Sequence, residues 1–117
     1  MNNELPSHLR SDCPINASLD LFGDRWSLLV VREIILKNAH KYGEFEAMAE
    51  GIPTNILANR LKKLTENGIL EKRPYQDRPV RYEYHLTKKG QALEPILHEM
   101  IKWGLAYVPG TGKSKGY

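Results

Sequence analysis

Cysteine is almost absent from this chain of 117 residues, which contains Cys13 alone. A single thiol cannot form a disulfide within the chain, so a disulfide-stabilised secreted fold is excluded. Apolar runs are short, because stretches such as residues 28–31 fall far below the roughly 20 residues that cross a bilayer. Residues 1–14 also lack the apolar stretch of a signal peptide. We therefore expect a cytoplasmic protein with no membrane partner.

Recognisable catalytic and metal-binding patterns are missing as well. The four histidines are scattered along the chain, at His8, His40, His85 and His98. None of them has a second ligand at metal spacing, and no serine or cysteine forms a catalytic set with them. We expect no enzymatic activity, no metal and no cofactor.

Length and composition indicate one globular domain. The chain is 41% hydrophobic and 26% charged, which is ordinary for a folded protein. A chain of this size buries roughly two thirds of its unfolded surface. Residues 1–12 are polar and aperiodic and predict a loose arm, whereas the glycine-rich residues 109–117 predict a flexible tail. The folded domain then covers residues 13–108.

Positive charge is concentrated in one third of the chain. Residues 54–89 carry nine basic and four acidic side chains, a local net charge of +5 in a chain whose net charge is only +3. The remaining residues therefore carry a net charge of −2. Such a concentration of positive charge is typical of a phosphate-binding face. Taken by itself, the charge is explained equally well by a solvated surface that is rich in lysine.

Three helices are expected before this basic region. A short apolar helix covers residues 14–22, and Asp24 is placed to cap the next helix, over residues 25–37. Trp26 lies on the apolar stripe of that second helix and is assigned to the core. A third, short helix is expected over residues 42–49, and a tight turn with glycine and proline follows it.

The next helix begins at Thr54 and is amphipathic. Its apolar face contains Leu57, Leu61 and Leu64. Its opposite face contains Asn55, Asn59, Lys62 and Glu66, with Lys63 at the flank. One face therefore packs and the other is free to touch a partner.

A β-hairpin follows this helix at once. Strands are expected over residues 69–75 and 80–86, around a turn that contains aspartate and proline. Alternation along the second strand places Tyr82 and Tyr84 on the core side. A helix, a turn, a second helix and a basic hairpin form a winged helix-turn-helix, a fold that reads DNA.

The outward residues have defined uses if the partner is DNA. An asparagine amide bonds bidentately to adenine in the major groove, which suits Asn55 and Asn59, one turn apart. Lysines at the same face, Lys62 and Lys63, meet phosphates. In the hairpin, Arg78 at the tip and Arg81 on the returning strand reach the backbone or a narrow minor groove. The alternative is that these are ordinary solvent-facing polar residues.

A final helix, capped by Thr87, has an apolar stripe wider than one small domain needs. The stripe consists of Leu93, Ile96, Leu97, Met100, Ile101 and Trp103. Its width indicates a second subunit on the far side, and we expect a homodimer.

Cys13 is the one reactive candidate, and two interpretations stay open. If Pro14 is the first residue of a helix, Cys13 lies at the positive end of that helix, which stabilises a thiolate. Alternatively, Cys13 is a small buried residue of the subunit interface. With one thiol per chain, a disulfide switch must join two subunits or a subunit and a small-molecule thiol.

The motifs of this chain occur together in one family. They are Cys13-Pro14, the GDRW run from Gly23, the VVREII segment, Phe45, GIPTNILANRLKKL, NGIL, YEYHLTKKG and Trp103-Gly104. In this combination the chain resembles the HxlR-type winged helix-turn-helix transcriptional regulators of bacteria and archaea, which are related to the MarR regulators. The resemblance covers nearly the whole chain, from Cys13 to about Val108.

The resemblance implies an α+β, mostly α fold, a winged helix-turn-helix with N-terminal and C-terminal dimerisation helices. It implies a homodimer that binds a pseudo-palindromic operator in double-stranded DNA, with a recognition helix from Thr54 and a wing with Arg78 and Arg81. Some members sense electrophiles or oxidants through the cysteine of the CP motif, here Cys13, so a small-molecule or electrophile effector is a further expected partner. The alternative function is a winged-helix module that binds protein and not DNA.

Overall fold

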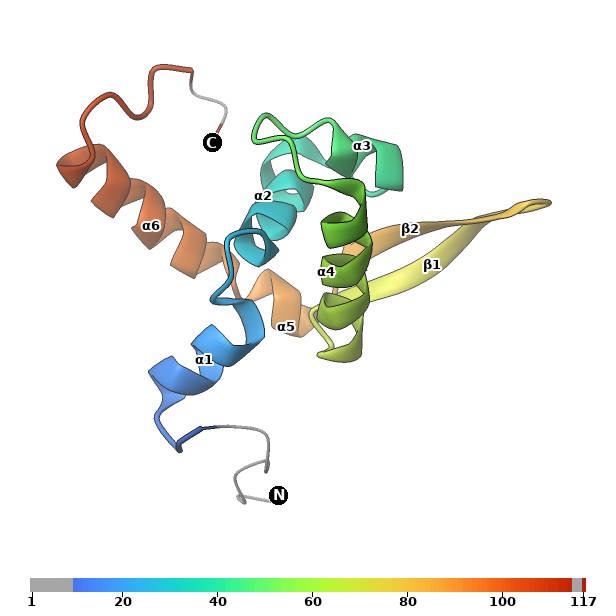
Figure 1. The fold of residues 1–117 in the computed structure, drawn as a ribbon, viewed down its shortest axis with the longest axis horizontal. Helices are drawn as coiled ribbons and strands as arrows, with labels where there is room; N and C mark the ends of the chain where they lie inside the picture. The colour runs from blue at the N-terminus through green and yellow to red at the C-terminus, as the bar shows by residue number, and fades with distance from the viewer. Residues whose placement is uncertain (1–9, 115–116) are drawn as a thin grey trace.

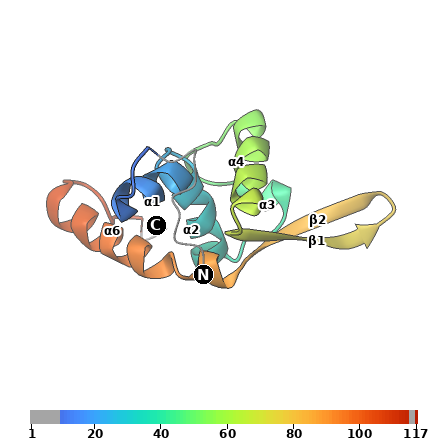
Figure 2. The same cartoon turned by 90° about the horizontal axis from the view of Figure 1, so that it is seen from below.

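The computed structural model describes residues 10–114 and 117. In chain order its elements are α1 (Pro14–Phe22), α2 (Ser27–Lys37), α3 (Tyr42–Glu46), α4 (Thr54–Glu66), β1 (Leu70–Asp77), β2 (Val80–Leu86), α5 (Lys88–Gln91) and α6 (Glu94–Tyr107). Two perpendicular views place α1 and α6 on one side of α2 and the hairpin on the other (Figure 1, Figure 2). Most of the arm predicted over residues 1–12 lies outside the described residues.

The core lies between α2, α3, α4 and the base of the hairpin. Its largest fully buried side chains are Phe45, Leu57, Leu61, Leu64, Ile69, Leu70, Val30 and Val31. Trp26 packs half-buried against this cluster, as the sequence predicted. Burial of each of these large apolar side chains contributes roughly 1.5–3 kcal/mol to folding.

Helix α2 begins two residues later than predicted. The Asp24 carboxylate accepts hydrogen bonds from the backbone N–H groups of Trp26, at 2.8 Å, and Ser27, at 2.9 Å. Asp24 therefore satisfies the free donors at the start of the helix, as predicted, but the first helical residue is Ser27.

Helix α3 is shorter than predicted and ends at Glu46. The chain then leaves the helix through turns, in which the N–H of Met48 donates to Phe45 and the N–H of Gly51 donates to Met48. Gly51 has a φ of +70°, a conformation that glycine adopts without steric cost. This turn redirects the chain into α4, so α3, the turn and α4 form a helix-turn-helix.

The two strands of the hairpin pair antiparallel, with Leu70 opposite Leu86 and Pro74 opposite Tyr82. A β-bulge interrupts the register between Pro74 and Gln76. Strand β1 runs two residues further than predicted, so the turn contains only two residues between the strands. The far half of the hairpin projects beyond the helices as a wing (Figure 1).

The single C-terminal helix that the sequence predicted is in fact two helices, α5 and α6. Thr87 caps α5 as expected, since its hydroxyl accepts a hydrogen bond from the N–H of Gly90 at 3.1 Å. The break follows from Pro95, which lacks an N–H and fits only the first turn of α6. A side chain at Gly90 would clash with the backbone carbonyl of Ile69, so glycine lets α5 approach the hairpin closely.

Within residues 10–114 and 117, the helices are all too short or too polar to cross a membrane. Over the same residues, no three His, Cys, Asp or Glu side chains gather in a way that could hold a metal ion.

Candidate nucleic-acid interface

Helix α4 has one packed face and one open face, as its sequence predicted. Leu57, Leu61 and Leu64 have at most 1% of their surface exposed. The opposite side chains are exposed, namely Asn55, Asn59, Lys62 and Lys63. The open face therefore presents two amides and two ammonium groups, a combination suited to base edges and phosphates.

The first turn of α4 is held by α3. The Tyr42 hydroxyl donates to the backbone carbonyl of Thr54 at 2.7 Å, and the Thr54 hydroxyl donates to Glu46 at 3.3 Å. These two bonds fix the angle between the helices of the helix-turn-helix. The second bond also engages the Thr54 hydroxyl with a side chain of α3, whereas Asn55, the next residue, is exposed.

Arg60 ties the middle of α4 to the start of α2, a contact that sequence reasoning missed. Its Nε donates to Asp24 at 2.9 Å, and its Nη1 donates to the amide oxygen of Asn59. Asp24 and Arg60 are 36 positions apart, and no local pattern links them. Only the packing of α2 against α4 brings the two side chains together.

Acid should weaken the contact between Arg60 and Asp24. Partial burial opposes ionisation of Asp24, but hydrogen bonds from Ser27, Trp26 and Arg60 outweigh it and lower the pKa from 3.8 to about 2. A carboxyl with a lowered pKa in the folded state stabilises the fold above its unfolded pKa and loses that contribution as the pH falls. We therefore expect the free energy of unfolding to fall between about pH 4 and pH 2.

Urea unfolding followed by circular dichroism at pH 7, 4 and 3 checks this expectation. Asp24→Asn should be less stable than the wild type at pH 7, by about 1 kcal/mol after solvent screening is allowed for. The variant should also lose less stability on acidification. The same acid dependence in both proteins would contradict the role given to Asp24.

The root of the wing is anchored to the connection between α2 and α3. The N–H of Tyr84 donates to the carbonyl of His40 at 2.7 Å, and the His40 and His85 rings stack with centroids 4.2 Å apart. The backbones of Lys41 and Glu83 also pair in an isolated antiparallel β-bridge. The hydrogen bond from His85 lowers the pKa of Glu83. The wing is thus a fixed extension of the helical body at its base.

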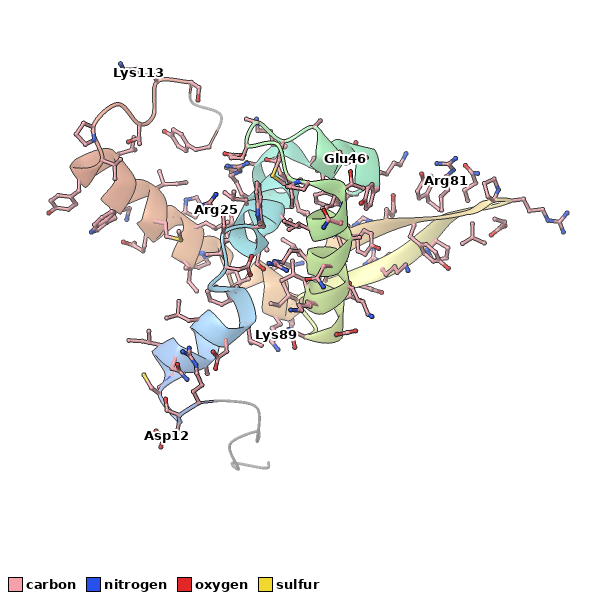
Figure 3. All side chains as sticks on the ribbon, in the orientation of Figure 1. Asp12, Arg25, Glu46, Arg81, Lys89 and Lys113 are labelled. Atoms are coloured by element: carbon pink, nitrogen blue, oxygen red, sulfur yellow. The ribbon has the colours of Figure 1, made fainter. Side chains whose placement is uncertain are left out.

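Beyond this root the wing is open and basic. Arg78 and Arg81 are exposed and form no ion pair with any residue that the structure describes. Figure 3 shows Arg81 on the projecting part of the hairpin. Lys72 lies 4.1 Å from the ring centroid of Tyr82, which orders a third cation on the wing.

The placement predicted for Tyr82 is wrong, whereas that for Tyr84 is right. Tyr84 packs edge-on against Phe45 with centroids 6.4 Å apart, but Tyr82 is 40% exposed. Both side chains are on the same face of the hairpin, yet the helices reach only as far as Tyr84. Alternation along a strand predicts which face of the hairpin a side chain lies on. It does not predict how far along that face the helices cover the hairpin.

Helix α6 carries an apolar face that is left uncovered by residues 10–114 and 117. Ile96 is 40%, Met100 53% and Trp103 63% exposed, while Leu97 and Ile101 are half-buried. On α1, Ile15 and Leu19 are likewise exposed at 72% and 53%. Leu93, which was predicted to lie in a dimer interface, requires a correction, because it is only 7% exposed and belongs to the core of the chain itself.

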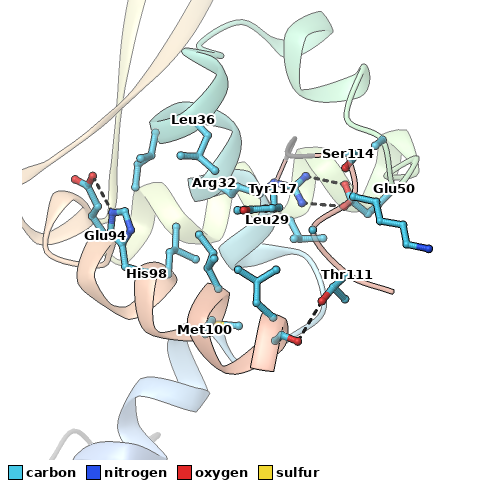
Figure 4. A pocket seen from close by; sticks show the side chains of 18 of the residues that line it. Leu29, Arg32, Leu36, Glu50, Glu94, His98, Met100, Thr111, Ser114 and Tyr117 are labelled. Atoms are coloured by element: carbon cyan, nitrogen blue, oxygen red, sulfur yellow. Dashed lines mark hydrogen bonds and ion pairs between the residues drawn. The ribbon is translucent and has the colours of Figure 1, made fainter. Parts of the chain in front are cut away.

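A cavity of about 570 Å³ lies between α2, α6 and the C-terminal segment (Figure 4). Its walls are largely apolar, and Arg32, which lines it, already donates two hydrogen bonds to Glu50, at 2.8 and 2.7 Å. That contact raises the pKa of Arg32 and lowers the pKa of Glu50 to about 2. Because these charges are paired, the cavity suits a neutral apolar molecule better than an anion.

Cys13 is exposed and directly precedes α1, whose first residue is Pro14. Its N–H donates to the Ser11 hydroxyl at 3.3 Å. The thiol is open to solvent among the described residues, next to the exposed side chains of α1.

A helix-turn-helix with an outward second helix, followed by a basic hairpin, defines the class of winged helix-turn-helix proteins. Within this class, a model of the HxlR-like helix-turn-helix family matches residues 21–111. The protein therefore belongs to the HxlR-like family of helix-turn-helix transcriptional regulators, which confirms the resemblance.

Similar proteins agree with this assignment. The HTH-type transcriptional regulator Rv3095 of Mycobacterium tuberculosis is 35% identical over 103 residues, which are 88% of this chain and 64% of Rv3095. The chain thus spans about 64% of the length of that relative. PA1607, described as a candidate transcription factor, superposes with a TM-score of 0.79 at 37% identity over 92% of this chain and 74% of PA1607.

The redox regulator HypR is similar in both of its redox forms. The oxidised form superposes with a TM-score of 0.72 at 31% identity, over 80% of this chain and 96% of HypR. The reduced form has the same TM-score at 30% identity, over 80% of this chain and 92% of HypR.

Proposed function

We propose that the protein is a sequence-specific regulator that binds a pseudo-palindromic DNA operator as a homodimer. The observation that carries this proposal is the open face of α4, with two asparagines and two lysines beside a basic wing. A module that binds protein would instead need apolar side chains on that face, because the buried centre of protein interfaces is depleted of charge. The polar face therefore favours DNA over the alternative of a protein-binding module.

In the proposed complex, α4 lies in the major groove and the wing follows the adjacent backbone. Two such helices, related by a two-fold axis, enter successive major grooves roughly 34 Å apart. Asn55 and Asn59 then face base edges, whereas Lys62 and Lys63 meet phosphates. Arg78 and Arg81 on the wing contact the flanking backbone or minor groove.

Two substitutions on α4 distinguish base reading from phosphate binding. Lys62→Ala should weaken binding to the operator and to a random duplex alike, by roughly tenfold at low salt. Asn59→Ala should lower affinity for the operator by about 1–3 kcal/mol and leave binding to the random duplex unchanged. Fluorescence anisotropy with both duplexes measures each effect. Equal, uniform losses from the two variants would show that Asn59 does not read bases.

The homodimer is proposed to form through α6 and α1. Ile96, Met100 and Trp103 supply a continuous exposed apolar strip on α6, and α1 adds two more apolar side chains. Homodimer interfaces are more apolar than other protein surfaces, so a second copy of this chain is the occupant that fits best. Leu97 and Ile101 lie half-buried beside the strip and line the cavity between α6 and α2.

We also propose that Cys13 senses thiol-reactive or oxidising compounds. The thiol is exposed at the start of α1, next to the proposed dimer interface, and the likeness to HypR in oxidised and reduced forms supports a redox role. In an oxidation by diamide, two Cys13 thiols lose two electrons and two protons to the diamide and form one disulfide between subunits. The proposed effector is therefore an electrophile or an oxidant.

Diamide should change the operator affinity of the wild-type protein by about tenfold or more, a typical coupling between two sites. Cys13→Ser should show no change, because a hydroxyl is not oxidised by diamide. Anisotropy titrations before and after treatment, with a non-reducing gel to detect covalent dimers, measure both results. Identical responses of the two proteins would remove Cys13 from the proposed mechanism.

A further inference from the structure

The amide of Asn59 has a defined orientation on the open face of α4. Arg60 Nη1 donates a hydrogen bond to the Asn59 side chain. A guanidinium group has five donors and no acceptor, so the atom of Asn59 that faces it must be the amide oxygen. The amide nitrogen, with its two donors, is then the end that points away from Arg60.

Arg60 is itself held in place. Its Nε donates at 2.9 Å to Asp24 Oδ1, which also accepts the backbone N–H groups of Trp26 and Ser27. The second carboxylate oxygen of Asp24 accepts the Ser27 hydroxyl. Since Asp24 is fixed by the start of α2, the guanidinium between it and Asn59 cannot rotate without breaking a charged hydrogen bond.

This orientation decides which base Asn59 can read. Adenine is recognised by an amide that donates to N7 and accepts from N6, which requires the oxygen and the nitrogen to face the base together. Here the oxygen is directed at Arg60. The outward donors instead match guanine, which presents two neighbouring acceptors, N7 and O6, in the major groove.

We infer that Arg60 is a positioning residue for DNA readout, which turns the donor end of Asn59 outward and thereby selects guanine at the base that faces Asn59. This inference rests on the proposed function and adds the base preference to it. It also replaces the adenine contact that the sequence suggested for Asn59. Arg60 has only 22% of its side chain exposed and two of its nitrogens engaged, so it acts through Asn59 and not by contacting phosphate.

Selection of bound duplexes from a library with randomised half-sites tests the inference on the full chain. The wild type should select guanine at one position of each half-site, and Asn59→Ala should lose the preference at that position alone. Arg60→Gln should shift that position from guanine toward adenine, with the ratio of the two affinities changing at least about tenfold, because the amide is then free to turn. Lys63→Gln, a neutralised cation on the same helix, is the matched control and should weaken binding with the selected sequence unchanged.

The outcomes separate the inference from the function on which it rests. If the wild type selects no sequence, the proposed DNA-reading function fails. If it selects a sequence with adenine opposite Asn59, or if Arg60→Gln keeps the wild-type preference, the role given to Arg60 is wrong. Where Arg60→Gln does not fold, as judged by thermal melting, Arg60→Met removes the same donor from Asn59 with an uncharged side chain of similar length and should produce the same shift.

Discussion

Raising the salt concentration from 50 to 200 mM should weaken binding of the wild-type protein to DNA from its own promoter by about four orders of magnitude. The reason is counterion release, since every phosphate that a lysine or arginine neutralises frees condensed cations from the duplex. With about four phosphates per subunit and eight per dimer, the logarithm of the affinity should fall against the logarithm of salt with a slope near −7. Fluorescence anisotropy at several salt concentrations measures this slope.

Variants of the basic side chains assign the slope to particular contacts. Lys62→Ala removes one contact from each subunit, so its slope should be smaller in magnitude by about two. Asn59→Ala removes no charge and should keep the wild-type slope, which makes it the matched control. A slope near zero for the wild type would rule out phosphate binding by α4 and the wing.

Trp103→Glu should convert the dimer to a monomer and reduce operator affinity by about a hundredfold or more, because two half-sites no longer bind as one unit. Trp103 is 63% exposed in the single chain, so the substitution places a charge in the proposed interface without disturbing the core. Sedimentation velocity and anisotropy measure the two effects, and the melting curve of the monomer shows whether the fold is intact.

The conservative variant Trp103→Phe keeps an aromatic, apolar side chain and should remain dimeric with near wild-type affinity. A dimer that persists with Trp103→Glu would move the interface away from α6. Loss of dimerisation in both variants would show that the size of the indole, more than its apolar character, holds the subunits together.

Much of the fold could be predicted from local patterns. The positions of α4 and of both strands follow from the periodicity of apolar residues, because one face of each element is packed and the other is exposed to solvent. The open face of α4, with Asn55 and Asn59, was predicted for the same reason. The break before α6 was missed although Pro95 signals it, since an apolar stripe that continues on both sides of a proline imitates one helix.

Contacts between distant segments could not be predicted. The pairing of Arg60 with Asp24 depends on how α2 crosses α4, and the anchoring of the wing by His40 depends on where the turn before α3 passes the hairpin. Neither contact leaves a periodic or spaced signal in the sequence. The exposure of Tyr82 was missed for a related reason, since the length of the wing beyond the helices is a property of the whole fold.

The architecture of the wing has a consequence for how the protein behaves at high concentration. A long two-stranded ribbon normally offers unpaired edges to which strands of other molecules add, the first step of aggregation. Here Pro74 and the adjoining bulge interrupt one edge, and the segment around His40 covers the base of the other. The exposed Arg78 and Arg81 also repel the same residues of a neighbouring copy. The ribbon is therefore protected against sheet extension, and copies of the protein can crowd together without joining through their wings.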